Sequence, residues 1–121
     1  IKDWSHWVVL YKEVETFLDE VLQQKNKPDA IFSSSDKLTT GCLRYFKENH
    51  IKIPKDVALV GFSNSNLTDL LYPPLTVVKQ PAFEMGQIAM QLLMELIESK
   101  HPVNQFETKV LESKLIIRES A

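Results

Sequence analysis

Three short polar segments of this 121-residue chain carry the side chains best suited to binding a ligand. SSSD occupies residues 33–36, SNSN occupies residues 63–66, and Lys79 and Gln80 precede Pro81. Hydroxyl, carboxamide and carboxylate groups make directional hydrogen bonds, which suit the hydroxyls of a sugar or nucleoside. The same residue types also cap helices and satisfy turns, so each segment has a purely structural interpretation as well.

Residues typical of a catalytic or metal centre are sparse. His6, His50 and His101 lack the close spacing of metal ligands, and three glycines in all leave no phosphate-binding glycine loop. We therefore expect no enzyme and no cofactor. Cys42 is the only cysteine, which excludes an internal disulfide. Its place in a helical pattern predicts a small buried residue, because a reactive thiol needs a base and a positive environment.

Composition and charge restrict the class of protein. With 44% hydrophobic and 25% charged residues, the chain is typical of a globular domain. Its net charge of -2 and its lack of a Lys/Arg run argue against a nucleic-acid surface on this part of the protein. The apolar runs are too short to cross a bilayer, and the N-terminus does not have the pattern of a signal peptide. These features predict no membrane association and a cytoplasmic location.

The first half of the chain alternates helical and strand patterns. Apolar residues at three- and four-residue intervals predict a helix over residues 10–24, and a strand follows over 30–33. A second helix is expected from Asp36, as its N-cap, to about residue 49. Residues 57–61 then predict a strand that is buried on both faces. This alternation predicts an α/β fold with a parallel sheet and covering helices.

The second half has looser spacing. We expect one irregular helical turn near residues 67–71 and a strand over 75–79. A long helix should begin near Pro81, with an apolar stripe broad enough to be buried against a sheet and also against a partner. A final strand is expected over residues 108–117, ending buried. The three polar segments follow predicted parallel strands, so they should meet at one edge of the sheet and form a crevice.

The order and spacing of these pieces resemble the lactose-repressor (LacI/GalR-type) family of bacterial transcription regulators. The residues that carry the resemblance are PDAIFSSSDKL, HIKIPKDVALVGFSN, YPPLTVVKQP, the helix that contains FEMGQ, and the terminal KLIIRES. Together they cover about residues 28–120. The combination is specific to the family, although each motif alone is not.

The resemblance implies a periplasmic-binding-protein-like core that is incomplete here, with only its C-terminal portion present. Residues 1–74 would form most of the C-terminal effector-binding subdomain. Residues 75–107 would be the crossover strand and helix of the other subdomain, and 108–121 the return strand. Family members dimerise and bind operator DNA through an N-terminal helix-turn-helix, which is absent from this chain. A small effector, often a sugar, controls their affinity for DNA. The alternative is a periplasmic-type sugar-binding transport protein of the same core fold.

The resemblance also implies residue roles. Trp4 would stack on the effector, with Trp7 as a competing candidate, and either ring has the alternative of packing on the first helix. Ser63 stands where the family usually has an aspartate, and a neutral serine is a weaker acceptor. The implied effector-binding residues are Trp4, Ser35, Asp36, Ser63, Asn64 and Gln80. The implied dimer-interface residues are Asn66, Leu67, Leu70, Leu71 and Tyr72.

Overall fold

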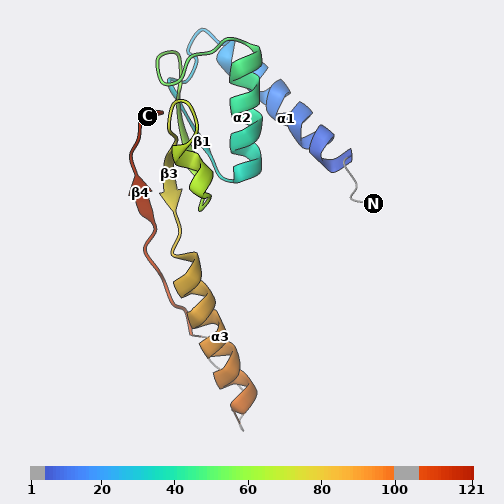
Figure 1. The fold of residues 1–121 in the computed structure, drawn as a ribbon. Coiled ribbons are helices and arrows are strands. Elements are labelled where there is room, and N and C mark those ends of the chain that lie inside the picture. Colours follow the sequence, from blue (N-terminus) through green and yellow to red (C-terminus); the bar gives the residue numbers. More distant parts are fainter. Residues whose placement is uncertain (1–4, 100–106) are drawn as a thin grey trace.

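The computed structural model of the chain describes residues 5–99 and 107–121, without the side chains of 5–10. Figure 1 shows their helices and strands. In chain order these are α1 (Ser5–Leu22), β1 (Ala30–Ser33), α2 (Asp36–Glu48), β2 (Ala58–Phe62), the 3-10 turn η1 (Asn66–Asp69), β3 (Thr76–Lys79), α3 (Ala82–Glu98) and β4 (Lys114–Ile116).

The strands form one mostly parallel sheet in the order β1-β2-β3-β4. Ser33 pairs with Gly61 and Phe62 with Val78, so β1, β2 and β3 run in the same direction. β4 is antiparallel to β3. The α/β fold with a largely parallel sheet and covering helices is therefore confirmed. The boundary expected at residues 74 and 75 falls just before β3, which belongs to the same sheet as β1 and β2.

A compact hydrophobic core joins the sheet to α1 and α2. These two helices pack against each other and lie on the same side of the strands in Figure 1. The apolar positions of α2 recur every three or four residues and bring one face of the helix onto β1 and β2. Cys42 is buried in this face, as expected. The buried core residues are Val14, Leu18, Cys42, Tyr45, Phe46, Val57, Leu59, Leu75 and Val77.

Two predicted helix starts were wrong. α1 begins at Ser5, several residues before the predicted start at residue 10. The N-cap of α2 is Ser35 and not Asp36: Ser35 has extended backbone angles, and its hydroxyl accepts a hydrogen bond from the Leu38 backbone N–H. Asp36 is already the first helical residue. Serine and aspartate are almost equally good N-caps, so residue type alone could not decide whether Ser35 or Asp36 caps the helix.

The molecule divides into two regions that we call the head and the arm. The head comprises α1, α2, η1 and the sheet, and the arm comprises α3 and the segment 107–113 that returns beside it (Figure 1). The apolar stripe of α3 is not covered by the sheet of this chain, because none of the described residues of the helix is buried. The predicted final strand was too long: β4 has three residues and is largely exposed.

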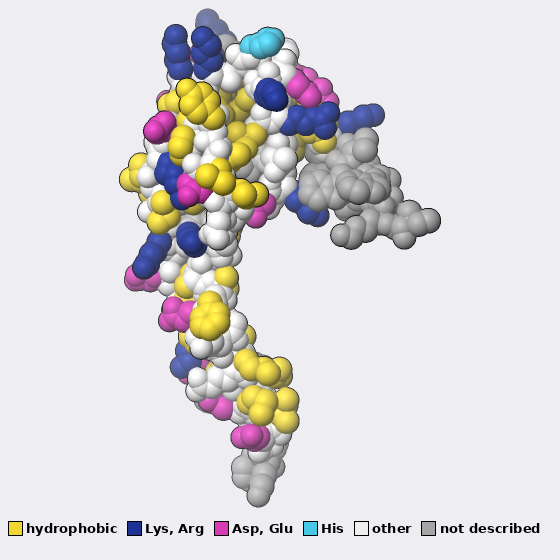
Figure 2. Space-filling model, viewed as in Figure 1, with side chains coloured by type: hydrophobic (Ala, Val, Ile, Leu, Met, Phe, Trp, Pro, Cys, Tyr) yellow, Lys and Arg dark blue, Asp and Glu magenta, His cyan; other side chains and the backbone are white. Residues whose placement is uncertain are grey.

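Apolar side chains remain uncovered along the arm, where Figure 2 shows them in yellow. Phe83 is 81% exposed, and Met90 and Ile97 are also exposed. Among the described residues, none of the helices is long and apolar enough to cross a bilayer.

Candidate functional site

The first polar segment lies at the carboxyl end of β1 and is held by local hydrogen bonds. Ser33 is buried, and its hydroxyl shares a hydrogen bond of 2.6 Å with the hydroxyl of Thr39. Ser35 accepts the Leu38 N–H at 3.3 Å. The carboxylate of Asp36 is exposed and has no hydrogen-bond or ion-pair partner among the described residues. Asp36 is therefore the charged acceptor in this segment that a ligand can reach.

The second polar segment follows β2 and is tied to the end of β3. The Ser63 N–H donates to the Val78 carbonyl at 3.1 Å, and the Ser63 hydroxyl, which is buried, accepts the Ser65 N–H at 3.0 Å. Asn64 is exposed, and its Oδ1 accepts the backbone N–H of Gln80 at 2.8 Å. The turn after β2 and the peptide after β3 are therefore in direct contact.

The structure places the predicted residues at one edge of the sheet, because they follow three adjacent parallel strands. It joins Asn64 to Gln80 by a hydrogen bond, whereas the Ser35 hydroxyl accepts from Leu38 of α2 and the Ser63 hydroxyl from Ser65 of its own segment. Trp4 lies outside the described residues. Trp7 belongs to α1, but its side chain also lies outside the described part of the chain. The stacking role of either ring stays a prediction.

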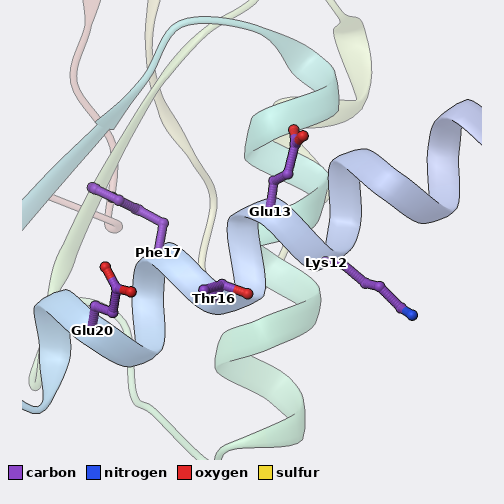
Figure 3. Close-up of a pocket in the computed structure, with 5 residues that line it drawn as sticks. All are labelled: Lys12, Glu13, Thr16, Phe17 and Glu20. Carbon is purple, nitrogen blue, oxygen red and sulfur yellow. The ribbon is translucent and has the colours of Figure 1, made fainter.

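Cavities on the head lie away from most of these residues. One of about 430 Å³ is lined by residues of α1 alone, and Figure 3 shows that Lys12 points away from Phe17, so this is an open groove along a single helix. Another, of about 320 Å³, lies between α1, β1 and α2 and is lined mainly by apolar side chains, including Phe32 and Leu38. Neither groove has the convergent polar groups of a sugar site.

A cavity on the arm side reaches the predicted edge. It has a volume of about 270 Å³ and lies between α3 and the returning segment, with Gln80 and Pro81 at one end and Lys109 and Ser113 among its other lining residues. Gln80 is therefore the predicted binding residue that lines one of these cavities, at the junction of head and arm.

Sequence reasoning missed the buried polar network at the end of the chain. Ser120 is 1% exposed; its hydroxyl accepts the Thr76 N–H at 2.8 Å and donates to the Leu59 carbonyl at 2.6 Å. The Arg118 guanidinium donates to the Leu75 carbonyl at 2.6 Å and to the Thr68 hydroxyl at 3.2 Å. Arg118 and Ser120 belong to the KLIIRES motif that contributed to the resemblance, which was the only available signal.

Burial is the main cause of the raised pKa values of two core side chains, Cys42 and Tyr45. Burial raises the pKa of the Cys42 thiol to about 11, so it stays protonated and unreactive at neutral pH. Burial, together with a hydrogen bond to Asp19, raises the pKa of Tyr45 to about 12. Across the described part of the chain, three or more His, Cys, Asp or Glu side chains are nowhere grouped to hold a metal ion.

Comparison with known proteins identifies the fold family. The model of the periplasmic binding protein-like domain matches residues 3–121. The chain belongs to this family. The ligand site of such α/β folds lies at the carboxyl ends of the strands, where the three polar segments of this periplasmic-binding-protein-like domain are found.

The similar proteins are transcription regulators. The chain is 36% identical over 100 residues to the HTH-type transcriptional regulator RegA of Clostridium acetobutylicum, covering 83% of this chain and 29% of RegA. It is 30% identical over 119 residues to the ribose operon repressor of Haemophilus influenzae, covering 95% and 35%. The chain therefore spans about a third of the length of these curated relatives.

Solved structures agree with this assignment. A LacI family transcriptional regulator from Enterococcus faecalis V583, with bound ribose, superposes with a TM-score of 0.75 at 31% identity, covering 91% of this chain and 40% of that one. The resemblance to the lactose-repressor family is thus confirmed, and the chain corresponds to the C-terminal part of the family's core.

Proposed function

We propose that this chain is the effector-binding and dimerisation portion of a LacI-type regulator in which a small sugar-like effector controls operator affinity. The observation that carries the proposal is the convergence of three polar segments at the carboxyl edge of the sheet, with the Asp36 carboxylate exposed and unpaired within the described residues. The ribose bound to the E. faecalis regulator supports a sugar as the class of effector. Because the relatives are regulators, they favour this function over transport and over catalysis. A cytoplasmic location follows from the proposed role in transcription.

Each polar group of the proposed site has a role that its chemistry allows. Asp36 accepts hydrogen bonds from effector hydroxyls, which is the stronger kind of hydrogen bond because the acceptor is charged. Ser35 accepts the Leu38 N–H and still has a hydroxyl proton to donate. Ser63 provides a second, neutral hydroxyl. The proposed effector-binding residues are Trp4, Ser35, Asp36, Ser63, Asn64 and Gln80.

A second surface supports dimerisation. In and after η1, Leu67, Leu70 and Tyr72 are 66%, 76% and 99% exposed, although all three are large and apolar or aromatic. Such clusters on a surface usually mark a contact with another protein. Leu71 is half-buried against the core and anchors the cluster. We propose that Asn66, Leu67, Leu70, Leu71 and Tyr72 contact a second copy of the protein.

The arm fits the proposed division of the core into subdomains. Residues 1–74 would belong to the C-terminal subdomain, 75–107 would cross to the other subdomain, and 108–121 would return. α3 leaves large apolar side chains such as Phe83 and Ile97 exposed, and an exposed apolar surface of this kind usually marks a contact, so the rest of the regulator would cover α3. Alone, the chain should dimerise or self-associate through this surface, which size-exclusion chromatography with light scattering would detect. A monodisperse monomer would contradict that expectation.

A thermal-shift screen of the full-length regulator tests the proposed function. A ligand that binds only the folded state at 100 times its Kd should stabilise that state by about 2.7 kcal/mol. We expect ribose or another sugar of a panel to raise the melting temperature, and matched concentrations of a non-sugar polyol serve as the control. Equal melting temperatures with every sugar and nucleoside would contradict the proposal.

A further inference from the structure

Two segments connect the head and the arm: the peptide after β3, and the segment 107–113 that leads into β4. β3 ends at Lys79 and α3 begins at Ala82, so residues 80 and 81 make the whole turn. Pro81 occupies the N-cap of α3 and provides no side-chain hydrogen bond to the helix. Because α3 buries none of its described residues, packing against the head does not fix its direction. The orientation of the arm therefore depends on what holds this short peptide and on the returning segment 107–113, which lines a cavity together with α3.

One side chain of the head is hydrogen-bonded to the peptide after β3. Asn64 Oδ1 accepts the Gln80 backbone N–H at 2.8 Å. Since the donor is a backbone N–H, the oxygen of the carboxamide must face Gln80, and the Nδ2 group must face the other way. Nδ2 has no hydrogen-bond partner among the described residues, and the Asn64 side chain is exposed. The Asn64 carboxamide thus uses its Oδ1 as an acceptor for Gln80 and has its Nδ2 available as a donor at the proposed effector edge.

The turn that carries Asn64 is itself held firmly. Ser63 N–H bonds to the Val78 carbonyl at 3.1 Å, and Ser63 Oγ accepts the Ser65 N–H at 3.0 Å. The Thr68 hydroxyl donates to the Ser65 carbonyl at 2.9 Å, and the Thr68 carbonyl accepts the Leu75 N–H at 2.8 Å. A displacement of the turn would therefore also displace the Gln80 peptide, through the hydrogen bond from Asn64.

We propose that Asn64 is a positioning residue that couples the effector edge to the arm. Its Oδ1 holds the crossover peptide at Gln80 and so sets the direction of α3, while its Nδ2 donates to the effector. Binding at the edge then changes the restraint on the arm through one side chain. The coupling presupposes the sugar-responsive regulator proposed above, whereas the restraint on the arm does not.

Distance measurements on the full-length regulator test this role. Spin labels at Lys52→Cys in the head and Glu98→Cys at the end of α3 report the distance distribution by pulsed electron resonance. Cys42 is buried and its thiol pKa is raised to about 11, so it should remain unlabelled. Without any sugar, Asn64→Ala should shift and broaden the distribution, because Gln80 N–H loses its acceptor. Asn64→Asp keeps an oxygen at that position and should restore the parental distribution.

A matched control variant and a measurement with bound sugar complete the test. Asn26→Ala removes an exposed asparagine from another loop of the head and should leave the distances parental. A parental distribution in Asn64→Ala, or an equally broadened one in Asn64→Asp, would overturn the restraint. With the sugar found by thermal shift, the parent should change its distribution and Asn64→Ala should not. Equal changes in both would overturn the coupling. A failure to find any sugar would contradict the proposed function and would leave the ligand-free result standing.

Discussion

Two amphipathic helices of this molecule differ in how far their apolar faces are buried. α2 in the head and α3 in the arm both carry large apolar residues at helical spacing. Phe46 of α2 is 1% exposed, whereas Phe83 of α3 is 81% exposed. α2 is covered because β1 and β2 lie against its apolar face, and α3 has no such cover. An apolar pattern therefore predicts that a helix forms and will be covered, but the covering surface can lie in another part of the protein.

The same contrast applies to polar groups. In the head, the described buried side-chain nitrogen and oxygen atoms all have hydrogen-bond partners. At the sheet edge, Asp36 and the Nδ2 group of Asn64 remain available. The head thus has a core whose described buried polar atoms are hydrogen-bonded, and a sheet edge with polar groups available to a ligand. The arm is exposed in this chain, which spans about a third of the length of the curated relatives.

Truncation of one phenylalanine in each region should give the largest difference. Phe46→Ala leaves a cavity in the core and should lower the free energy of unfolding by about 3–5 kcal/mol. Phe83→Ala removes a side chain that is mostly in water and should change the 121-residue chain by no more than about 0.5 kcal/mol. Urea denaturation followed by circular dichroism measures both.

The full-length regulator sharpens this comparison. If the rest of the protein covers α3, Phe83→Ala should become clearly destabilising there, while the effect of Phe46→Ala stays similar. If Phe83→Ala changes the free energy of unfolding by no more than about 0.5 kcal/mol in the full-length regulator as well, this part of the arm is not covered there.

A smaller difference is expected between two serines. Ser120→Ala removes the acceptor of the Thr76 N–H and the donor to the Leu59 carbonyl inside the core, and should cost about 1–3 kcal/mol. Ser113→Ala alters an exposed serine of the arm and should have almost no effect on unfolding. Comparable losses in the two variants would show that the buried network is not what secures the end of the chain.

The sequence was most informative where the structure depends on neighbouring residues. The strand at 30–33 and the end of α2 near residue 49 were predicted closely, because local periodicity and capping chemistry determine them. The polar segments were placed at one edge of the sheet because parallel strands dictate it. Of the site itself, the convergence of the segments was predictable, and the bond between Asn64 and Gln80 was not.

Long-range contacts explain what could not be predicted. Ser120 bonds to Thr76 and Leu59, which are 44 and 61 residues away in the chain. No periodic pattern encodes such partners. The surface that would cover the apolar stripe of α3 could not be identified for a related reason, since a helical pattern does not say where its partner lies. In the structure the sheet ends at β4 and the helix runs away from it (Figure 1).

Calorimetric titration of the full-length regulator with its stabilising sugar tests the central claim most directly. Asp36→Ala changes the carboxyl end of β1, and Asp29→Ala removes an exposed aspartate just before the opposite end of the same strand. If the carboxyl edge binds the effector, Asp36→Ala should weaken binding by about tenfold or more, the loss of a charged hydrogen bond worth about 1.5–3 kcal/mol. Asp29→Ala should bind like the parent. Parental affinity in Asp36→Ala would contradict the assignment of the effector to this edge.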